Sequence, residues 1–171
     1  MKYTIYTDGV ADNFLLPHYG GWAWQSIDED GVVAHSEGHA QATTGNRMAM
    51  VAAIDAVRRL PDYSECEIYT NNKYVTVTFG NKANYTKYNA NSDLICEFHT
   101  ILLNKHIDCN MVWLKSRTNN LLDEMRDIAL GQFYIISDIE ITNPMLYEKD
   151  KEYHKKINAL IRARKELYEG L

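Results

Sequence analysis

The spacing of apolar and polar residues predicts strands at the start of the chain and alternating helices and strands after them. Residues 2–8 alternate between polar and apolar positions, as a half-buried strand does. Residues 20–27 form a second such segment, and the polar turn at 28–31 favours a hairpin that returns over 32–41. We expect the later elements in this order: a helix over 48–60, a strand over 65–70, a short helix over 72–79, a helix over 92–105, a strand over 107–114 and a helix over 121–130.

This order of elements predicts an α/β fold with a five-stranded mixed sheet flanked by helices. Three consecutive strands pair as antiparallel neighbours, whereas strands that are separated by helices become parallel. The expected core domain spans residues 1–132. Residues 133–171 form a C-terminal extension, in which 133–141 is strand-like and 146–169 has apolar residues on one helical face. That face either packs on the chain's own domain or serves self-association or the docking of a protein partner.

Composition is that of an ordinary globular domain. Of the 171 residues, 46% are hydrophobic and 24% are charged. The chain has no run of about 18 apolar residues, so we expect no membrane span. The N-terminus lacks the apolar stretch of a signal peptide. The three cysteines match neither a zinc pattern nor a disulfide framework, which favours a cytoplasmic location.

The charge distribution limits how the chain can meet nucleic acid. The net charge is −5, which excludes indiscriminate attraction to a polyanion. Residues 1–145 hold 11 basic and 18 acidic side chains, whereas residues 146–171 hold 7 basic and 5 acidic ones. Any contact of the main body with nucleic acid must therefore come from a local patch.

Four positions fall at the ends of predicted strands or on predicted helices in a way that indicates a shared site. Asp8 ends the first strand, and Asn71 follows the fourth. Ala49 lies in the first turns of one helix, and Asp127 lies on the last helix of the core. Ligands of such sheets gather at the carboxyl ends of strands. We therefore expect these four positions to converge.

In their order and spacing, the motifs around these positions resemble those of the ribonuclease H type 1 family over about residues 3–130. The motifs are Thr7-Asp8-Gly9, Thr44-Gly45-Asn46-Arg47-Met48, Thr70-Asn71-Asn72-Lys73-Tyr74-Val75, Val112-Trp113-Leu114-Lys115 and Asp123-Glu124-Met125-Arg126-Asp127. The resemblance implies a hydrolase that cuts the RNA strand of RNA–DNA hybrids, using four carboxylates that hold two Mg²⁺ ions, or Mn²⁺ in their place. Asp8 then matches the first catalytic carboxylate and Asp127 the fourth.

Two of that family's four carboxylate positions hold other residues here. Ala49 stands where a glutamate is expected, and Asn71 stands where an aspartate is expected. Alanine has no ligand atom, and asparagine offers only a neutral oxygen. The metal ligands left are Asp8, Asp127 and a weakened Asn71, so we expect Mg²⁺ to bind weakly or not at all. The segment 116–119 also lacks the histidine that the family's mobile loop often carries.

The resemblance also implies a nucleic-acid-binding surface around these positions. The family contacts the hybrid backbone and its 2′-hydroxyl groups there, a type of contact that distinguishes RNA from DNA. Arg47 has an alternative role, because it can equally pair with a neighbour on the helix surface. The residues that match such positions, or add positive charge near them, are Thr43, Asn46, Arg47, Asn72, Lys73, Lys115 and Arg117.

The sequence leaves three functions open. The first is a pseudo-nuclease that binds RNA–DNA hybrid or structured nucleic acid at a degenerate two-metal site and cleaves weakly or not at all. The second is a genuine hybrid-cleaving endonuclease in which deliberate changes at positions 49 and 71 silence catalysis. The third is a protein-interaction module on the same fold, motivated by the acidic body and by residues 146–171.

Overall fold

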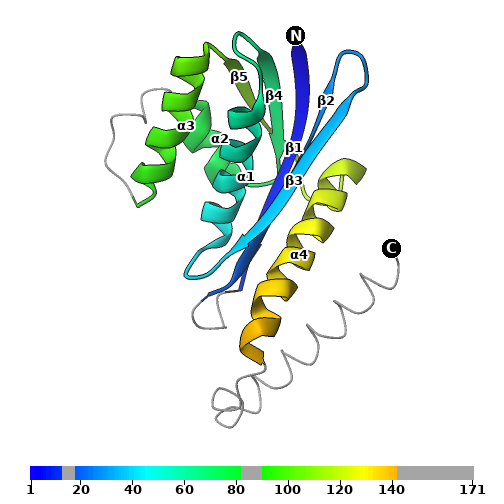
Figure 1. The fold of residues 1–171 in the computed structure, drawn as a ribbon, viewed down its shortest axis with the longest axis vertical. Coiled ribbons are helices and arrows are strands. Elements are labelled where there is room, and N and C mark those ends of the chain that lie inside the picture. The colour runs from blue at the N-terminus through cyan, green and yellow to red at the C-terminus, as the bar shows by residue number, and fades with distance from the viewer. Residues whose placement is uncertain (13–17, 82–89, 142–171) are drawn as a thin grey trace.

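The computed structural model describes residues 1–12, 18–81 and 90–141, and Figure 1 shows how their strands and helices are arranged. The described elements follow the predicted order, and most boundaries lie within three residues of those expected. They are β1 (Lys2–Ala11), β2 (Gly20–Asp28), β3 (Val33–Ala40), α1 (Gly45–Arg59), β4 (Glu65–Thr70), α2 (Lys73–Gly80), α3 (Ser92–Lys105), β5 (Asp108–Trp113) and α4 (Asn120–Ile141).

The strands form one five-stranded sheet in the order β3-β2-β1-β4-β5. β1 pairs antiparallel with β2, and β2 pairs antiparallel with β3. β1 pairs parallel with β4, and β4 pairs parallel with β5. The predicted mixed α/β sheet is therefore confirmed. Because β1 and β4 run in the same direction, the residues that follow them emerge at the same edge of the sheet.

The two faces of the sheet are covered by different helices. Figure 1 shows α1, α2 and α3 on one side and α4 on the other. Successive side chains of a strand point to opposite faces. Accordingly, a Cβ built on Gly9 would meet the α1 backbone at Ala49, and one built on Gly21 would meet the α4 backbone at Ala129. Both helices therefore touch the sheet closely near the end of β1.

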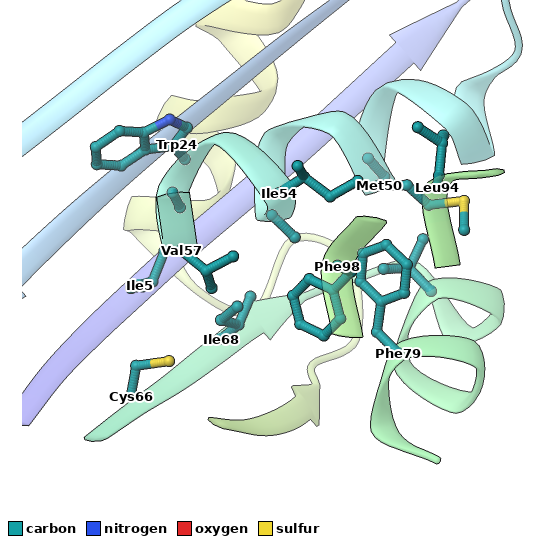
Figure 2. Packing of buried hydrophobic residues seen from close by; sticks show 14 of the residues in the cluster. Ile5, Trp24, Met50, Ile54, Val57, Cys66, Ile68, Phe79, Leu94 and Phe98 are labelled. Carbon is teal, nitrogen blue, oxygen red and sulfur yellow. The ribbon is translucent and has the colours of Figure 1, made fainter. Parts of the chain in front are cut away.

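The main core lies between the sheet and helices α1–α3. Ile5 and Ile68, which are fully buried, pack from the sheet against Val57 of α1 (Figure 2). Phe98 of α3 stacks on Phe79 of α2, with ring centroids 4.0 Å apart. Burial of an aliphatic or aromatic side chain contributes about 1.5–3 kcal/mol. This cluster therefore holds α1 firmly over β1 and β4.

Helix α1 begins and ends at recognisable signals. The Thr44 hydroxyl accepts a hydrogen bond from the backbone N–H of Arg47 at 3.1 Å, which caps the helix N-terminus. Arg58 and Arg59 occupy the last turn, where positive charge is favourable. Pro61 follows closely and cannot continue a helix. The cap moves the start of the helix three residues before the predicted position 48.

The strand expected over residues 133–141 does not form, because these residues continue α4 as a helix. The run is rich in β-branched and aromatic residues, which favour strands in isolation. Packing on the sheet decides otherwise, since the buried residues of α4 recur at helical spacing through this segment. The expected domain boundary at 132/133 thus falls inside a helix. The buried residues concerned are Leu122, Met125, Ala129, Phe133 and Ile136.

The rest of the predicted extension, including the amphipathic segment 146–169, lies outside the described residues. Its proposed roles in self-association or partner docking stay predictions. Among the described helices, none combines the length and the hydropathy that crossing a membrane requires.

Candidate functional site

Asp8 lies on the face of β1 that α4 covers. Its ladder partner is Ala23 of β2, which packs against Met125 of α4. The Asp8 side chain is only 2% exposed. Its Oδ1 accepts a hydrogen bond from the Gly9 N–H at 2.8 Å. Its Oδ2 is buried and accepts no hydrogen bond of standard geometry from the described residues, although the Asn71 amide is close enough to act on the carboxylate.

Burial raises the pKa of Asp8 from 3.8 to about 6, because the ionised form loses its hydration. The Gly9 N–H, the positive charge of Arg126 and the Asn71 amide lower this pKa, in decreasing order. The negative charge of Asp123 raises it further. Asp8 is therefore a carboxylate that is shielded from water, and a cation placed nearby would favour its ionised form.

Ala49 lies where a second acidic group was expected. Its backbone nitrogen would be 2.1 Å from a Cβ on Gly9, so α1 touches β1 right beside Asp8. Ala49 is 1% exposed. A longer side chain at this position would start from the helix backbone that touches Gly9, the residue after Asp8. The methyl group that is present supplies packing and no donor atom.

Asn71 follows β4 at the same edge of the sheet. The parallel ladder pairs Tyr6 with Tyr69, so Asp8 and Asn71 each lie two residues beyond that pair. The side-chain amide of Asn71 is near enough to lower the pKa of Asp8 as a hydrogen-bond donor. Its backbone carbonyl accepts a hydrogen bond from Trp113 Nε1 at 3.1 Å, which ties the end of β4 to β5.

The structure distinguishes Asp127, the expected fourth carboxylate, from its neighbour Asp123. Asp127 is exposed and is not among the charges that shift the pKa of Asp8. Asp123, one helical turn earlier, is partly buried, and its negative charge acts on Asp8. α4 covers the face of β1 that carries Asp8, and Ala23, the ladder partner of Asp8, shares a buried cluster with Met125 and Ala129 of this helix. Of the two acidic residues, Asp123 is the one whose charge acts on Asp8.

The donor set does not fit a two-ion metal centre. Its carboxylates are Asp8 and Asp123, and Asn71 adds one neutral amide oxygen. Within the described ranges, no group of three or more His, Cys, Asp or Glu residues could hold a metal ion. Two divalent ions carry a charge of +4, and Mg²⁺ requires hard oxygen ligands with close charge compensation. A pair of carboxylates with Arg126 nearby falls well short of that requirement.

Asn46 and Asn72 lie in contact next to Asn71, and Lys73 follows them at the start of α2. Asn72 Nδ2 donates to Asn46 Oδ1 at 2.8 Å, which links the N-termini of α1 and α2. Asn72 also caps α2 by accepting from the Val75 N–H at 3.1 Å. The Lys73 ammonium lies 4.5 Å from the ring centroid of Trp113. These contacts give a polar and basic strip along one edge of the site.

Arg47 takes the structural role that the sequence left open as an alternative. Its guanidinium forms two hydrogen bonds to the carboxylate of Asp93, at 3.0 and 2.7 Å. It also donates to Asn91 Oδ1 at 3.3 Å. This bidentate contact raises the pKa of Arg47 and lowers that of Asp93. Arg47 thus connects α1 to the start of α3.

Thr43, which was expected among the nucleic-acid-binding residues, is almost fully buried. It is 6% exposed and its hydroxyl is buried. Its methyl group packs against Gly20. Lys115 and Arg117 are exposed between β5 and α4 and stay candidates for contact with nucleic acid.

Sequence reasoning overlooked Asp123 and Arg126, although a signal for both was present. Apolar residues of α4 recur at positions 122, 125, 129, 133 and 136, a spacing that defines the helix face turned to the sheet. Asp123 and Arg126 flank that face at the level of Met125. Trp113 at the end of β5 is 39% exposed and contacts both Lys73 and Asn71.

Comparison with known proteins shows which family the chain belongs to. Over 78 residues, the chain is 40% identical to ribonuclease H of Chlorobium luteolum, a match that covers 46% of this chain and 51% of that protein. The chain thus spans about half the length of that relative. Over 136 residues, it is 35% identical to ribonuclease HI of Rickettsia prowazekii, covering 70% of this chain and 82% of the relative.

The fold and the family model lead to the same assignment. The crystal structure of LC11-RNase H1 in complex with RNA/DNA hybrid matches 72% of this chain and 92% of that one, with a TM-score of 0.58 and 23% sequence identity. At this level of sequence identity, the match shows only that the two proteins share a fold. The model of the RNase H family matches residues 1–128. The chain therefore belongs to the ribonuclease H family.

Proposed function

We propose that this protein binds RNA–DNA hybrid, or other structured nucleic acid, and cleaves it weakly or not at all. One observation carries the proposal: Asp8 and Asp123 are the carboxylates of the described site, and Ala49 and Asn71 stand at the other two positions. Hydrolysis by two metal ions depends on activating a water and stabilising the leaving oxygen. Loss of either contribution commonly lowers the rate by orders of magnitude.

The binding half of the proposal is supported by the surface beside the site. Asn46 and Asn72 offer amide groups suited to phosphate and 2′-hydroxyl oxygens, and Lys73 adds an exposed cation next to Trp113. A family relative of similar fold, LC11-RNase H1, is described in complex with RNA/DNA hybrid. Since the net charge is −5, we expect binding that depends on this local patch and weakens steeply with salt.

The proposal is tested by fluorescence anisotropy with a labelled RNA–DNA hybrid in EDTA over a range of salt concentrations. We expect a complex in the micromolar range or tighter at about 50 mM salt, which weakens as salt rises. Duplex DNA of the same sequence serves as the comparison, because contacts to 2′-hydroxyl groups favour the hybrid. Absence of a salt-dependent complex with either duplex overturns the proposal.

The intact surroundings of the two altered positions favour a second candidate, a genuine hybrid-cleaving ribonuclease H silenced at positions 49 and 71. The α1 backbone still contacts Gly9, and the Asn71 side chain still reaches toward Asp8. The genomic sequence at codons 49 and 71 separates natural from deliberate substitution. If the double variant Ala49→Glu/Asn71→Asp gives no Mg²⁺-dependent cleavage, this second candidate fails.

A further inference from the structure

Trp113 is the last residue of β5, and two parts of its side chain contact neighbouring elements. Its ladder partner is Thr70, the last residue of β4. The indole N–H donates to the carbonyl of Asn71, the next residue along the chain from Thr70, at 3.1 Å. The Lys73 ammonium lies over the indole ring, 4.5 Å from its centroid. One side chain thus contacts both the residue that follows β4 and the first residue of α2.

Packing in the core does not explain this placement. Cys109 and Met111, on the same face of β5, pack against the main core. Trp113 is instead 39% exposed, so it gains only part of the burial energy that an aromatic side chain can provide. Its contacts with Asn71 and Lys73 are therefore the main consequence of having tryptophan at this position.

Lys73 lies at a place that its own charge disfavours. It is the first residue of α2, and the first turn of this helix contains no acidic residue. The positive end of the helix dipole repels a cation there. The long and flexible lysine stem would let the ammonium move away into water. The electron-rich face of an indole attracts a cation, so Trp113 keeps the ammonium at the end of β5.

We propose that Trp113 is a positioning residue for nucleic-acid binding: it holds the Lys73 ammonium where this cation contacts a backbone phosphate of the hybrid. The inference rests on the proposed function. Phosphate contacts fix the register of a protein on a duplex. A cation that is already held in place loses less side-chain entropy on binding than one that moves freely. Trp113 therefore strengthens the complex through Lys73.

The first test examines the free protein by NMR. An aromatic ring shifts the resonances of protons that lie over its face, so we expect upfield ε-methylene resonances for Lys73. The shift should persist in Trp113→Phe and disappear in Trp113→Leu. Lys105, whose ammonium donates to the Arg58 carbonyl, is the internal reference. If the Lys73 resonances match those of Lys105 in the unmodified protein, the inference is overturned and the proposed function stands.

The second test measures hybrid binding in EDTA at low salt. We expect Trp113→Leu to weaken the complex about three-fold, as the loss of an exposed cation–π contact predicts, and Trp113→Phe to restore most of the affinity. Because Trp113 acts through Lys73, the double variant Trp113→Leu/Lys73→Ala should bind no more weakly than Lys73→Ala alone. Tyr63→Leu is the matched control, because Tyr63 is an exposed aromatic residue that precedes β4, at the opposite end of that strand from Trp113.

The outcomes separate this inference from the proposed function. Hybrid binding by Trp113→Leu equal to that of the unmodified protein overturns the inference and leaves the proposed function standing. Losses that add up in the double variant do the same, because Trp113 would then act independently of Lys73. An equal loss in Tyr63→Leu also overturns the inference. Absence of any hybrid complex overturns both.

Discussion

The backbone of Ala49 lies directly against Gly9, so that a Cβ on Gly9 would come within 2.1 Å of the Ala49 nitrogen. This contact fixes the first turns of α1 at the end of β1. Position 49 is thereby fixed against Gly9, the residue that follows Asp8, whatever side chain it carries.

Replacing Gly9 by alanine tests this contact. The added methyl group has no space against the α1 backbone, so we expect Gly9→Ala to lower the free energy of unfolding by about 3 kcal/mol. Urea denaturation followed by circular dichroism measures the change. Gly45→Ala is the control, because the nearest atom to its Cβ lies 3.9 Å away. Equal stabilities of the two variants would contradict the close approach of α1 and β1.

The stability of the metal-free protein should depend on pH through Asp8, whose pKa burial raises from 3.8 to about 6. Below pH 4 the carboxyl group is protonated in both the folded and the unfolded chain. Between pH 4 and 6 the unfolded chain loses the proton and the folded protein keeps it, so the free energy of unfolding falls as pH rises. A shift of this size corresponds to about 3 kcal/mol.

Asp8→Asn should remove this dependence. We expect the variant and the unmodified protein to be equally stable near pH 4, and the variant to be more stable by up to about 3 kcal/mol at pH 8 in EDTA. Asp62→Asn, at an exposed position, corrects for the general effect of charge. If the free energy of unfolding changed with pH in the same way for all three proteins, Asp8 would not be shielded from water in the folded state.

Asp123 and Asp127 can be told apart by substituting each. Because the negative charge of Asp123 raises the pKa of Asp8, Asp123→Asn should lower that pKa. Asp127→Asn, one turn further along α4 and exposed, should leave it unchanged. Carboxyl carbon NMR titration of Asp8 measures both. The opposite pattern would return Asp127 to the site.

Lys73 should contribute to hybrid binding through its charge. We expect Lys73→Ala to weaken the hybrid complex a few-fold and to lower the salt slope by about one. Lys105→Ala is the control, because Lys105 Nζ donates to the Arg58 carbonyl at the far end of α1. If Lys105→Ala weakens binding as much as Lys73→Ala does, the proposed surface is misplaced.

The sequence predicts the element order because local signals agree with the final packing. Alternation over residues 2–8, the caps before α1 and Pro61 after it all indicate the elements that form. Asp8 and Asn71 are likewise placed by following two parallel strands to their ends. In these segments local preference and tertiary structure favour the same conformation.

The failures occur where tertiary packing selects among local alternatives. Residues 133–141 favour a strand locally, yet Phe133 and Ile136 extend the apolar face of α4 and are buried. Asp123 and Asp127 are one turn apart, and the way α4 packs on the sheet, with Met125 and Ala129 in one cluster with Ala23, decides which charge acts on Asp8. Whether a helix or a strand forms, and which aspartate lies near Asp8, depends on contacts between distant segments. The residue pattern of a single segment does not reveal those contacts.

The most direct test of the central claim is turnover of a labelled RNA–DNA hybrid by the unmodified protein with Mg²⁺ and with Mn²⁺. Since two carboxylates cannot balance two divalent ions, we expect turnover far below about 1 s⁻¹ with either metal, although the hybrid binds. Cleavage at about 1 s⁻¹ or faster, in the ordinary range of enzymes, would contradict the account.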